Sequence, residues 1–366
     1  MSEQVEASGN VRTERPRPWR RFVAIALALH LPLFAYPVLR LCHWLALGAW
    51  LTTVLFLPLF FSQIVARVYL RDPKTRLAFW LRRAADIWLG ISPVLLCLTL
   101  LGELPVLFDW FSPDSTAQTI LTAAGLLTIY SIANAYVPSV VTVQLSSAKL
   151  KRPLSFVQIT DVHIGSRSSA FLGRVIDRVS RLEPEFLCIT GDFIDARNVS
   201  EEQLGALKTL SIPVYFSIGN HERYGDLEDI VRRLRNLGVT VLRNQAHHED
   251  EIQFIGIDDM DDARQVERQL AKLEVDQSKF VLLLYHRPRG LEAAAAAGID
   301  LMISGHTHNG QIVPFNFVVG HVFEMARGLF REGESHMYVS PGTGTWGPVM
   351  RLGTRGEITL FKINPR

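Results

Sequence analysis

The sequence predicts an α/β domain that follows an all-α transmembrane region. Long apolar stretches with few charged residues are confined to the chain before Pro138. After that point, short apolar runs of strand length alternate with segments of helical spacing, which is typical of an α/β core. The 366 residues are enough for two domains. We therefore expect a basic tail over residues 1–21, a transmembrane region over 22–138 and an α/β domain over 139–366.

Four stretches of the first part are each about as long as a helix needs to cross roughly 30 Å of hydrocarbon. They cover residues 22–39, 41–66, 87–102 and 117–138. Arg20 and Arg21 precede the first stretch, so a cleaved export signal with a twin-arginine element is an alternative. Because further apolar stretches follow and no clear cleavage site does, about four membrane helices are the preferred interpretation.

The distribution of basic residues predicts the orientation of these helices. The loop between the second and third stretches carries six Lys or Arg residues, and the loop between the third and fourth carries none. The tail is basic too, and Lys149, Lys151 and Arg152 follow the last stretch. Cytoplasmic loops hold the excess of Lys and Arg. We therefore expect an integral multi-pass membrane protein whose C-terminal domain lies in the cytoplasm.

Composition adds two further expectations. The net charge of +2 at pH 7 provides no electrostatic basis for nucleic-acid binding, so no nucleic-acid partner is expected. The three cysteines, Cys42, Cys97 and Cys188, include no CxxC pair, which is typical of free thiols in a reducing compartment. The sequence leaves the oligomeric state open.

Polar side chains follow five predicted strands of the second part, at the point where each strand ends. The strands cover residues 154–160, 186–190, 214–218, 280–285 and 301–304. Ligands of open α/β sheets bind outside the carboxyl ends of the strands, so we expect these side chains to meet in one pocket. The set comprises Asp161, His163, Asp192, Asn220, His221, His286, His306 and His308.

The chemistry of this set indicates a metal site. Imidazole, carboxylate and carboxamide groups together suit borderline divalent ions such as Mn, Fe or Zn. The set holds more ligands than one ion needs, whereas two neighbouring ions that share a bridging carboxylate would use them. Single motifs such as Gly191-Asp192 are as often turns, and an isolated histidine such as His286 is usually packed in a core. The ordered set is much more specific than any of its parts.

The same residues resemble the motifs of the calcineurin-like metallophosphoesterases. That family's pattern is Asp-x-His, Gly-Asp, Gly-Asn-His-Asp/Glu, a later His, and Gly-His-x-His, and the chain has all five in this order. The resemblance covers about residues 154–363. Residues 305–312 and 350–357 look like the branch of the family that has N-terminal transmembrane segments. The resemblance implies a sandwich of two mixed β-sheets flanked by helices.

The resemblance also implies a role for each site residue. His221 would protonate the leaving oxygen, and Glu222, at a position where many relatives have Asp, would help to hold His221. The residues implied to bind the two divalent metal ions are Asp161, His163 and His308 for one, Asn220, His286 and His306 for the other, and Asp192 as the bridge.

The implied function is cleavage of a phosphoester or pyrophosphate bond by a membrane-anchored phosphohydrolase. The anchor favours a lipid-linked substrate, and a nucleotide–lipid such as UDP-diacylglucosamine is a case known among membrane-associated relatives. One alternative is a membrane transporter or scaffold protein with a non-catalytic metal-binding domain, which should have lost ligands. Another is a secreted or periplasmic esterase. No further cofactor is expected, because residues 342–347 match G-x-G-x-x-G without the helix that a dinucleotide site needs.

Overall fold

The computed structural model describes residues 28–70, 75–196 and 199–366. The basic tail, the beginning of the first expected membrane stretch, Arg71 and Lys74 lie outside the described residues. The chain divides into two compact units, and each is described by itself. One unit comprises residues up to 71 together with 95–121, and the other comprises 72–94 together with 122–366.

Helices dominate the described chain up to residue 135, as the apolar stretches predict. Three helices are long and apolar enough to cross a membrane, namely Ala49–Tyr69, Arg76–Leu107 and Pro113–Ala135. The first is α3 (Ala49–Ile64) continued by the π-helix η2 (Val65–Tyr69), and the others are α4 (Arg76–Leu107) and α5 (Pro113–Ala135). The described part of the first expected stretch runs through the π-helix η1 (Leu31–Ala35) into α2 (Tyr36–Trp44).

An ion pair accounts for two charged residues in the apolar part of the first unit. Arg40 of α2 donates from Nη2 to Oε2 of Glu103 on α4 at 2.6 Å, and the hydroxyl of Tyr36 donates to Oε1 at 2.6 Å. Charged groups in apolar surroundings are costly unless they are paired in this way. The pairing is consistent with α4 continuing past Glu103 to Leu107.

The second unit contains two six-stranded mixed sheets, which confirms the fold expected from the resemblance. The strand order is β1-β12-β2-β3-β4-β5 in the first sheet and β10-β11-β9-β8-β7-β6 in the second. The pairs β12–β2, β6–β7 and β10–β11 are antiparallel, and the others are parallel. The strands are β1 (Ser139–Ser147), β2 (Leu154–Ile159), β3 (Phe186–Thr190), β4 (Val214–Ser217), β5 (Thr240–Val241), β6 (Gln245–Glu249), β7 (Ile252–Ile257), β8 (Phe280–Tyr285), β9 (Leu301–Ser304), β10 (Gly328–Glu332), β11 (Ser335–Val339) and β12 (Glu357–Pro365).

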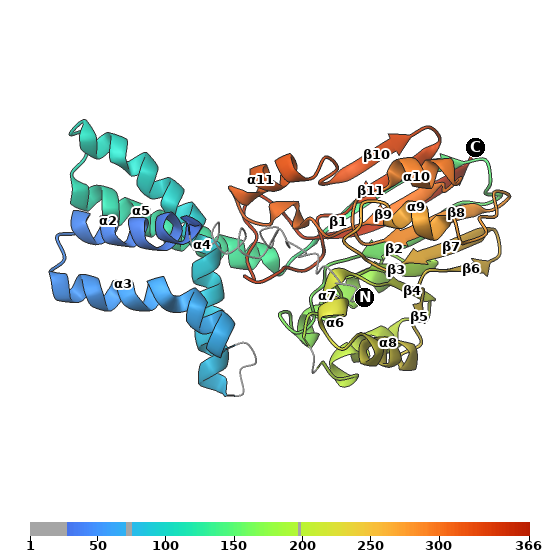
Figure 1. The fold of residues 1–366 in the computed structure, drawn as a ribbon, viewed down its shortest axis with the longest axis horizontal. Coiled ribbons are helices and arrows are strands. Elements are labelled where there is room, and N and C mark those ends of the chain that lie inside the picture. The colour runs from blue at the N-terminus through green and yellow to red at the C-terminus, as the bar shows by residue number, and fades with distance from the viewer. Residues whose placement is uncertain (1–27, 71–74, 197–198) are drawn as a thin grey trace, which may run out of the picture. The chain divides into compact units, whose positions relative to one another are not determined.

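Helices cover the outer face of each sheet (Figure 1). Those of this unit after β1 are α6 (Ser169–Ser180), η3 (Glu202–Thr209), α7 (Asn220–Tyr224), α8 (Leu227–Asn236), α9 (Gln265–Leu270), α10 (Leu291–Ala296), η4 (His308–Gly310) and α11 (Phe315–Val322). Apolar residues of α6 and α8 share one buried cluster with β2, β3 and β4. Those of α9 and α10 share another with β7, β8 and β9.

A third apolar cluster lies between the two sheets. At its centre Phe156 of β2 stacks on Phe186 of β3 and on Phe361 of β12, with ring centroids 4.8 and 4.7 Å apart. Successive side chains of a strand point to opposite faces, so Phe156 faces the sandwich interior while Val157 belongs to the cluster that includes α6. Burial of both faces explains why these strands read as continuous apolar runs.

Candidate metal centre

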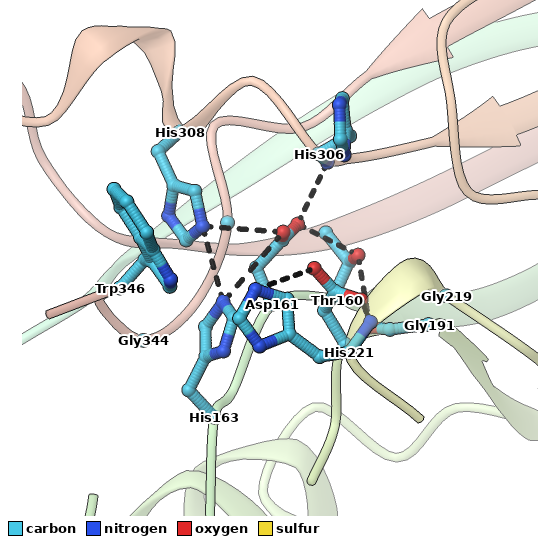
Figure 2. Close-up of polar contacts among 12 residues, drawn as sticks. Thr160, Asp161, His163, Gly191, Gly219, His221, His306, His308, Gly344 and Trp346 are labelled. Atoms are coloured by element: carbon cyan, nitrogen blue, oxygen red, sulfur yellow. Dashed lines mark hydrogen bonds and ion pairs between the residues drawn. The ribbon is translucent and has the colours of Figure 1, made fainter. Parts of the chain in front are cut away.

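The predicted site residues lie in the loops that follow β2, β3, β4, β8 and β9. The first three strands are parallel neighbours in one sheet, and the last two are parallel neighbours in the other. The carboxyl ends of both groups meet at the same end of the sandwich. This arrangement brings side chains that are far apart in the sequence into one place (Figure 2).

One cluster consists of Asp161, His163 and His308. The Nε2 atoms of His163 and His308 are 3.1 Å apart, and Oδ1 of Asp161 lies 3.3 Å from Nε2 of His308 and 4.0 Å from Nε2 of His163. All three residues are buried, and their potential ligand atoms lie within 4.8 Å of one another. The geometry therefore suits a single ion held by one carboxylate and two imidazoles.

The second cluster consists of Asp192, His286 and His306. Nε2 of His286 lies 3.1 Å from Oδ2 of Asp192 and 3.1 Å from Nδ1 of His306. The backbone N–H of His306 donates to Oδ2 of Asp161 at 3.0 Å, so the loop after β9 joins the two clusters. Two adjoining groups of carboxylate and imidazole atoms are thus present, as a dinuclear site requires.

Asn220 and His221 begin the short helix α7 beside the second cluster. The backbone N–H of His221 donates to Oδ1 of Asp192 at 2.9 Å, and Nε2 of His221 lies 3.9 Å from Oδ2 of the same carboxylate. The ring of His221 is 4.7 Å from that of His163. The structure therefore brings His221 to both clusters, with part of its side chain exposed to solvent.

Five candidate ligands have a left-handed backbone conformation. A positive φ is uncommon outside glycine, costs on the order of 1–3 kcal/mol and is concentrated at functional sites. The residues are Asp161 (54°), His163 (57°), Asp192 (49°), His306 (75°) and His308 (48°).

Two of the glycines beside the ligands are explained by close packing. A Cβ atom at Gly219 would collide with the carboxylate of Asp192, and one at Gly305 would collide with the carboxylate of Asp161. Only a residue without a side chain allows these loops to approach the carboxylates so closely.

The residues present fit a pair of divalent ions. Among the described residues, Oδ1 of Asp161 and Oδ1 of Asn220 are buried side-chain oxygens without a hydrogen-bond partner. Buried oxygens normally accept a hydrogen bond, so these two are suited to a cation instead. Together with the facing imidazole nitrogens they form the mixed nitrogen and oxygen donor set that Mn, Fe and Zn accept.

Comparison with known proteins agrees with this geometry. Residues 154–310 match the family model of the calcineurin-like phosphoesterases. A Danio rerio protein described as a transmembrane protein with metallophosphoesterase domain is 30% identical over 346 residues, which cover 84% of this chain and 78% of that protein. The chain belongs to the calcineurin-like metallophosphoesterase family.

Two bacterial relatives show how much of the chain the similarity covers. An uncharacterized metallophosphoesterase of Campylobacter jejuni is 28% identical over 340 residues, 84% of this chain and 88% of that protein. One of Aquifex aeolicus is 32% identical over 258 residues, 66% of this chain and 97% of that protein. The similarity to the first of these relatives extends well beyond the 154–310 match, over most of the length of both chains.

Neighbouring imidazoles of the metallophosphoesterase domain have opposite pKa shifts, which follow from burial and from the charges beside them. Burial lowers the pKa of His286, but the charge of Asp192 and its hydrogen bond outweigh burial and raise that pKa to about 10. Burial and the positive charge of His286 lower the pKa of His306 to about 2. Burial and His163 likewise lower the pKa of His308. In each pair of touching imidazoles one ring therefore holds an extra proton more tightly than the other, and a bound divalent ion would displace it.

Glu222 lies behind the site and supports the loop that carries Asp192. Its Oε1 accepts from the backbone N–H groups of Phe193 and Ile194 at 2.7 and 3.0 Å, and its Oε2 accepts from those of Asp192 and Gly219 at 3.0 and 2.9 Å. The family resemblance implies that Glu222 helps to hold His221. The carboxylate instead contacts backbone groups, so any effect on His221 passes through this loop.

Asp195 is a carboxylate that the sequence pattern did not single out. Its Oδ2 lies 3.5 Å from Nδ1 of His163, and it also accepts a hydrogen bond of 2.6 Å from the hydroxyl of Ser166. Burial lowers the pKa of His163, but Asp195 outweighs burial and raises it. His163, Asp195 and His221 form a third group of potential ligands. A signal was present, because Asp195 follows the end of β3 in the same loop as Asp192.

Arg351 is a second residue that the pattern did not single out. It is fully buried, and its Nη2 donates to the carbonyl oxygens of Pro341, Gly342 and Gly344 at 2.8, 3.1 and 2.8 Å. Its Nη1 lies 3.4 Å from the carbonyl oxygen of His308. Burial lowers the pKa of this guanidinium to about 10. Arg351 thus fastens the glycine loop over residues 342–347 to a candidate ligand.

Proposed function

We propose that the chain is a membrane-anchored phosphohydrolase that cleaves a phosphoester or pyrophosphate bond with two divalent metal ions. The observation that carries this proposal is the convergence of donor atoms from five strand ends into two adjoining clusters. Family membership supports the same reaction class. The ligand set is complete, which weighs against a transporter or scaffold with a non-catalytic metal domain.

The clustering supports the ligand assignment that the family resemblance implies. Asp161, His163 and His308 would hold one ion, and Asn220, His286 and His306 would hold the other. Asp192 would bridge them, because its carboxylate touches His286 and accepts a hydrogen bond from the backbone N–H of His221, whose ring contacts His163 of the other cluster. When bound, a pair of divalent ions supplies positive charge that stabilises the attacking and leaving oxygens of phosphoryl displacement.

His221 is the proposed proton donor to the leaving oxygen. Its ring is partly exposed and lies beside both clusters, so a substrate phosphate held there would reach it. Burial lowers the pKa of His221, so its imidazolium is a stronger acid but is less populated at neutral pH. A positioned general acid contributes about 10²–10⁴ to the rate. Glu222 and Asp195 are positioning residues, because they hold the Asp192 loop and His163 in place.

The membrane segments favour a lipid-linked substrate. Three helices of the described chain are long and apolar enough to span a bilayer, and the Danio rerio relative is described as a transmembrane protein. β1 begins at Ser139, four residues after α5 ends, so the proposed anchor ends where the catalytic domain begins. A tether of this kind raises the effective concentration of lipid headgroups at the site. A nucleotide–lipid such as UDP-diacylglucosamine is a suitable candidate.

The experiment that tests this function is hydrolysis of bis-p-nitrophenyl phosphate by the purified full chain. We expect the activity to require Mn, Fe or Zn, to disappear with a chelator and to be absent in Asp192→Ala. Metal analysis of the same preparations should give two ions for each chain and fewer in the variant. Hydrolysis that persists in chelator would reject the dinuclear mechanism. A reporter fused after Pro138 tests the proposed cytoplasmic side.

A further inference from the structure

The metal centre is bordered by a helix whose apolar side chains are exposed. α11 has no buried residue, and Phe317, Val318 and Val322 are 71%, 54% and 67% exposed. No Lys, Arg, Asp or Glu occurs between Gln311 and Phe323. A surface helix of a soluble domain normally turns a charged or polar face to water. Apart from His321, the exposed side chains of α11 are apolar, so the helix is stabilised by an apolar partner.

α11 is attached to the metal centre at both of its ends. It packs against η4, the short helix that begins with His308. Just after α11, the ring of Phe323 contacts the ring of His306, with centroids 5.7 Å apart. The exposed helix therefore lies beside His306 and His308, the two candidate ligands in the loop after β9.

A second exposed aromatic residue, Trp346, lies on another border of the centre, in the loop between β11 and β12. Trp346 is 58% exposed, and its ring is 6.4 Å from that of His221 (Figure 2). Gln311 joins the two borders, because its Oε1 accepts from the backbone N–H of Trp346 at 2.9 Å and its Nε2 donates to the Trp346 carbonyl at 3.0 Å. We call Phe317, Val318, Val322 and Trp346 the apolar collar.

The loop that carries Trp346 is hydrogen-bonded to α5 and packs closely against α4, and both helices are candidate membrane spans. The backbone N–H of Arg351 donates to the carbonyl oxygen of Ser131 in α5 at 2.9 Å, and the side-chain amide of Asn134 donates to the carbonyl oxygen of Arg351 at 3.0 Å. Gly90 of α4 approaches so closely that a Cβ atom there would lie 2.7 Å from Sδ of Met350. Asn134 is in the last turn of α5, so the loop between β11 and β12, which carries Trp346, is held close to the point where a membrane helix would end.

We propose that the apolar collar lies in the surface of the lipid bilayer and holds the metal centre at the level of the lipid headgroups. The inference rests on the proposed membrane anchoring and names the partner surface of the same site. The bilayer is the apolar phase that the neighbouring spans bring within reach, and an uncharged helix is stabilised when it lies at the interface. Trp346 suits this position, because an indole ring combines an apolar body with one N–H donor.

The test is a fluorescence measurement on the full chain in vesicles of phosphatidylcholine and phosphatidylglycerol. Val318→Cys is labelled with a nitrobenzoxadiazole dye in a background in which Cys97 is replaced by Ala, since Cys42 and Cys188 are buried. Two control sites carry the same dye. Leu57→Cys lies on α3 in a candidate span, and Glu267→Cys lies on α9, where its side chain is 51% exposed. Lipids with a doxyl group on the acyl chain serve as quenchers.

We expect the doxyl lipids to quench the dye at positions 318 and 57 but not at 267. Quenching at 57 with none at 318 would overturn the collar proposal while the anchor stands. No quenching at 57 would reject the anchoring on which the collar rests. A blue shift at 318 without quenching would indicate that a second copy of the chain covers α11, and would also overturn the proposal.

A pair of charged substitutions provides a second, independent readout. Adding Phe317→Asp and Val322→Asp to the chain labelled at 318 should reduce quenching about tenfold, because a carboxylate is costly at that depth. Leu329→Asp, which alters an exposed apolar residue of β10 outside the collar, should leave quenching unchanged. Equal effects of the two changes would contradict a specific contact between the collar and the bilayer. This readout needs no turnover, so it does not depend on catalytic activity.

Discussion

The side-chain amide of Asn134 donates a hydrogen bond of 3.0 Å to the carbonyl oxygen of Arg351, although 217 residues separate them in the chain. The guanidinium of Arg351 in turn fastens the glycine loop and lies 3.4 Å from the carbonyl oxygen of His308. A candidate membrane helix, a buried arginine and a candidate metal ligand are therefore connected by successive contacts. The end of α5 is a structural part of the catalytic unit as well as a proposed anchor.

Arg351→Lys is expected to destabilise the catalytic unit. An ammonium group cannot reach the carbonyl oxygens of Pro341, Gly342 and Gly344 in the way that a planar guanidinium does. Carbonyl groups left unpaired in a buried place cost about 1–3 kcal/mol, so the free energy of unfolding should fall by about 2–4 kcal/mol. Urea unfolding of the full chain in detergent measures this loss. Arg355→Lys, at an exposed position nearby, is the matched control and should change little.

His221→Ala is expected to keep both metal ions and to lose turnover. The proposed ligands are untouched, whereas the proton donor to the leaving oxygen is gone. For an alkyl phosphodiester we expect kcat to fall about 10²–10⁴-fold. The loss should be smaller for a p-nitrophenyl ester, because p-nitrophenolate leaves without a proton. Metal analysis and kcat for the two substrates are the measurements. Unchanged turnover, or loss of metal, would refute the assigned role.

Glu222→Gln and Glu222→Asp are expected to differ. In the native protein, backbone N–H groups donate to the carboxylate oxygens of Glu222. Glutamine would replace one of these oxygens by an NH₂ group, which is a donor and cannot accept from an N–H. We expect this variant to lose about 2 kcal/mol of stability and to bind metal more weakly, because the Asp192 loop is no longer held. Aspartate keeps both acceptor oxygens and should be impaired less. Thermal unfolding with and without metal ions tests this order, and a reversed order would count against the role in the loop.

Metal loading is expected to release protons near neutral pH. The pKa of His286 is raised above 6.5 to about 10, so the metal-free domain carries this proton at neutral pH. A raised pKa contributes stability that is fully present below pH 6.5 and is lost as the pH rises through about 10. The metal-free chain should therefore become less stable across this window, whereas the loaded chain should not, because the ion replaces the proton.

Two measurements check the proton release. Thermal unfolding across pH 6.5–10, with and without metal ions, gives the pH dependence of stability over the window set by His286. Calorimetric titration with metal in two buffers of different ionisation enthalpy gives the number of protons released. Identical heats in the two buffers would contradict the charged state assigned to His286.

The convergence of the site was predictable because strand direction follows from the chain. His163 and His308 are 145 residues apart, yet their nitrogens lie 3.1 Å from each other, since β2 and β9 end on the same side of the sandwich. The pattern of apolar runs located the five strand ends and therefore the candidate ligands. It did not predict α11, whose apolar run resembles a strand as much as a helix.

The division into two sheets was not contained in the periodicity. It depends on which strands pair. β1, the first strand along the chain, pairs in parallel with β12, the last strand. Strand alternation predicts only an α/β core, and it was the resemblance to the family that predicted a sandwich. Pairing across such a separation is decided by packing of the whole unit, which no local pattern records.

By itself the sequence determined the apolar helices, the α/β class and the carboxylate, amide and imidazole groups at the strand ends. Only the tertiary structure decided which groups support these side chains. Asp195 contacts His163, Glu222 accepts hydrogen bonds from four backbone N–H groups, and Arg351 donates to several carbonyl oxygens. The physical reason is that periodicity and motif spacing report local backbone structure. The partner of a buried polar group is instead set by irregular loops, several with positive φ, whose course depends on all their neighbours at once.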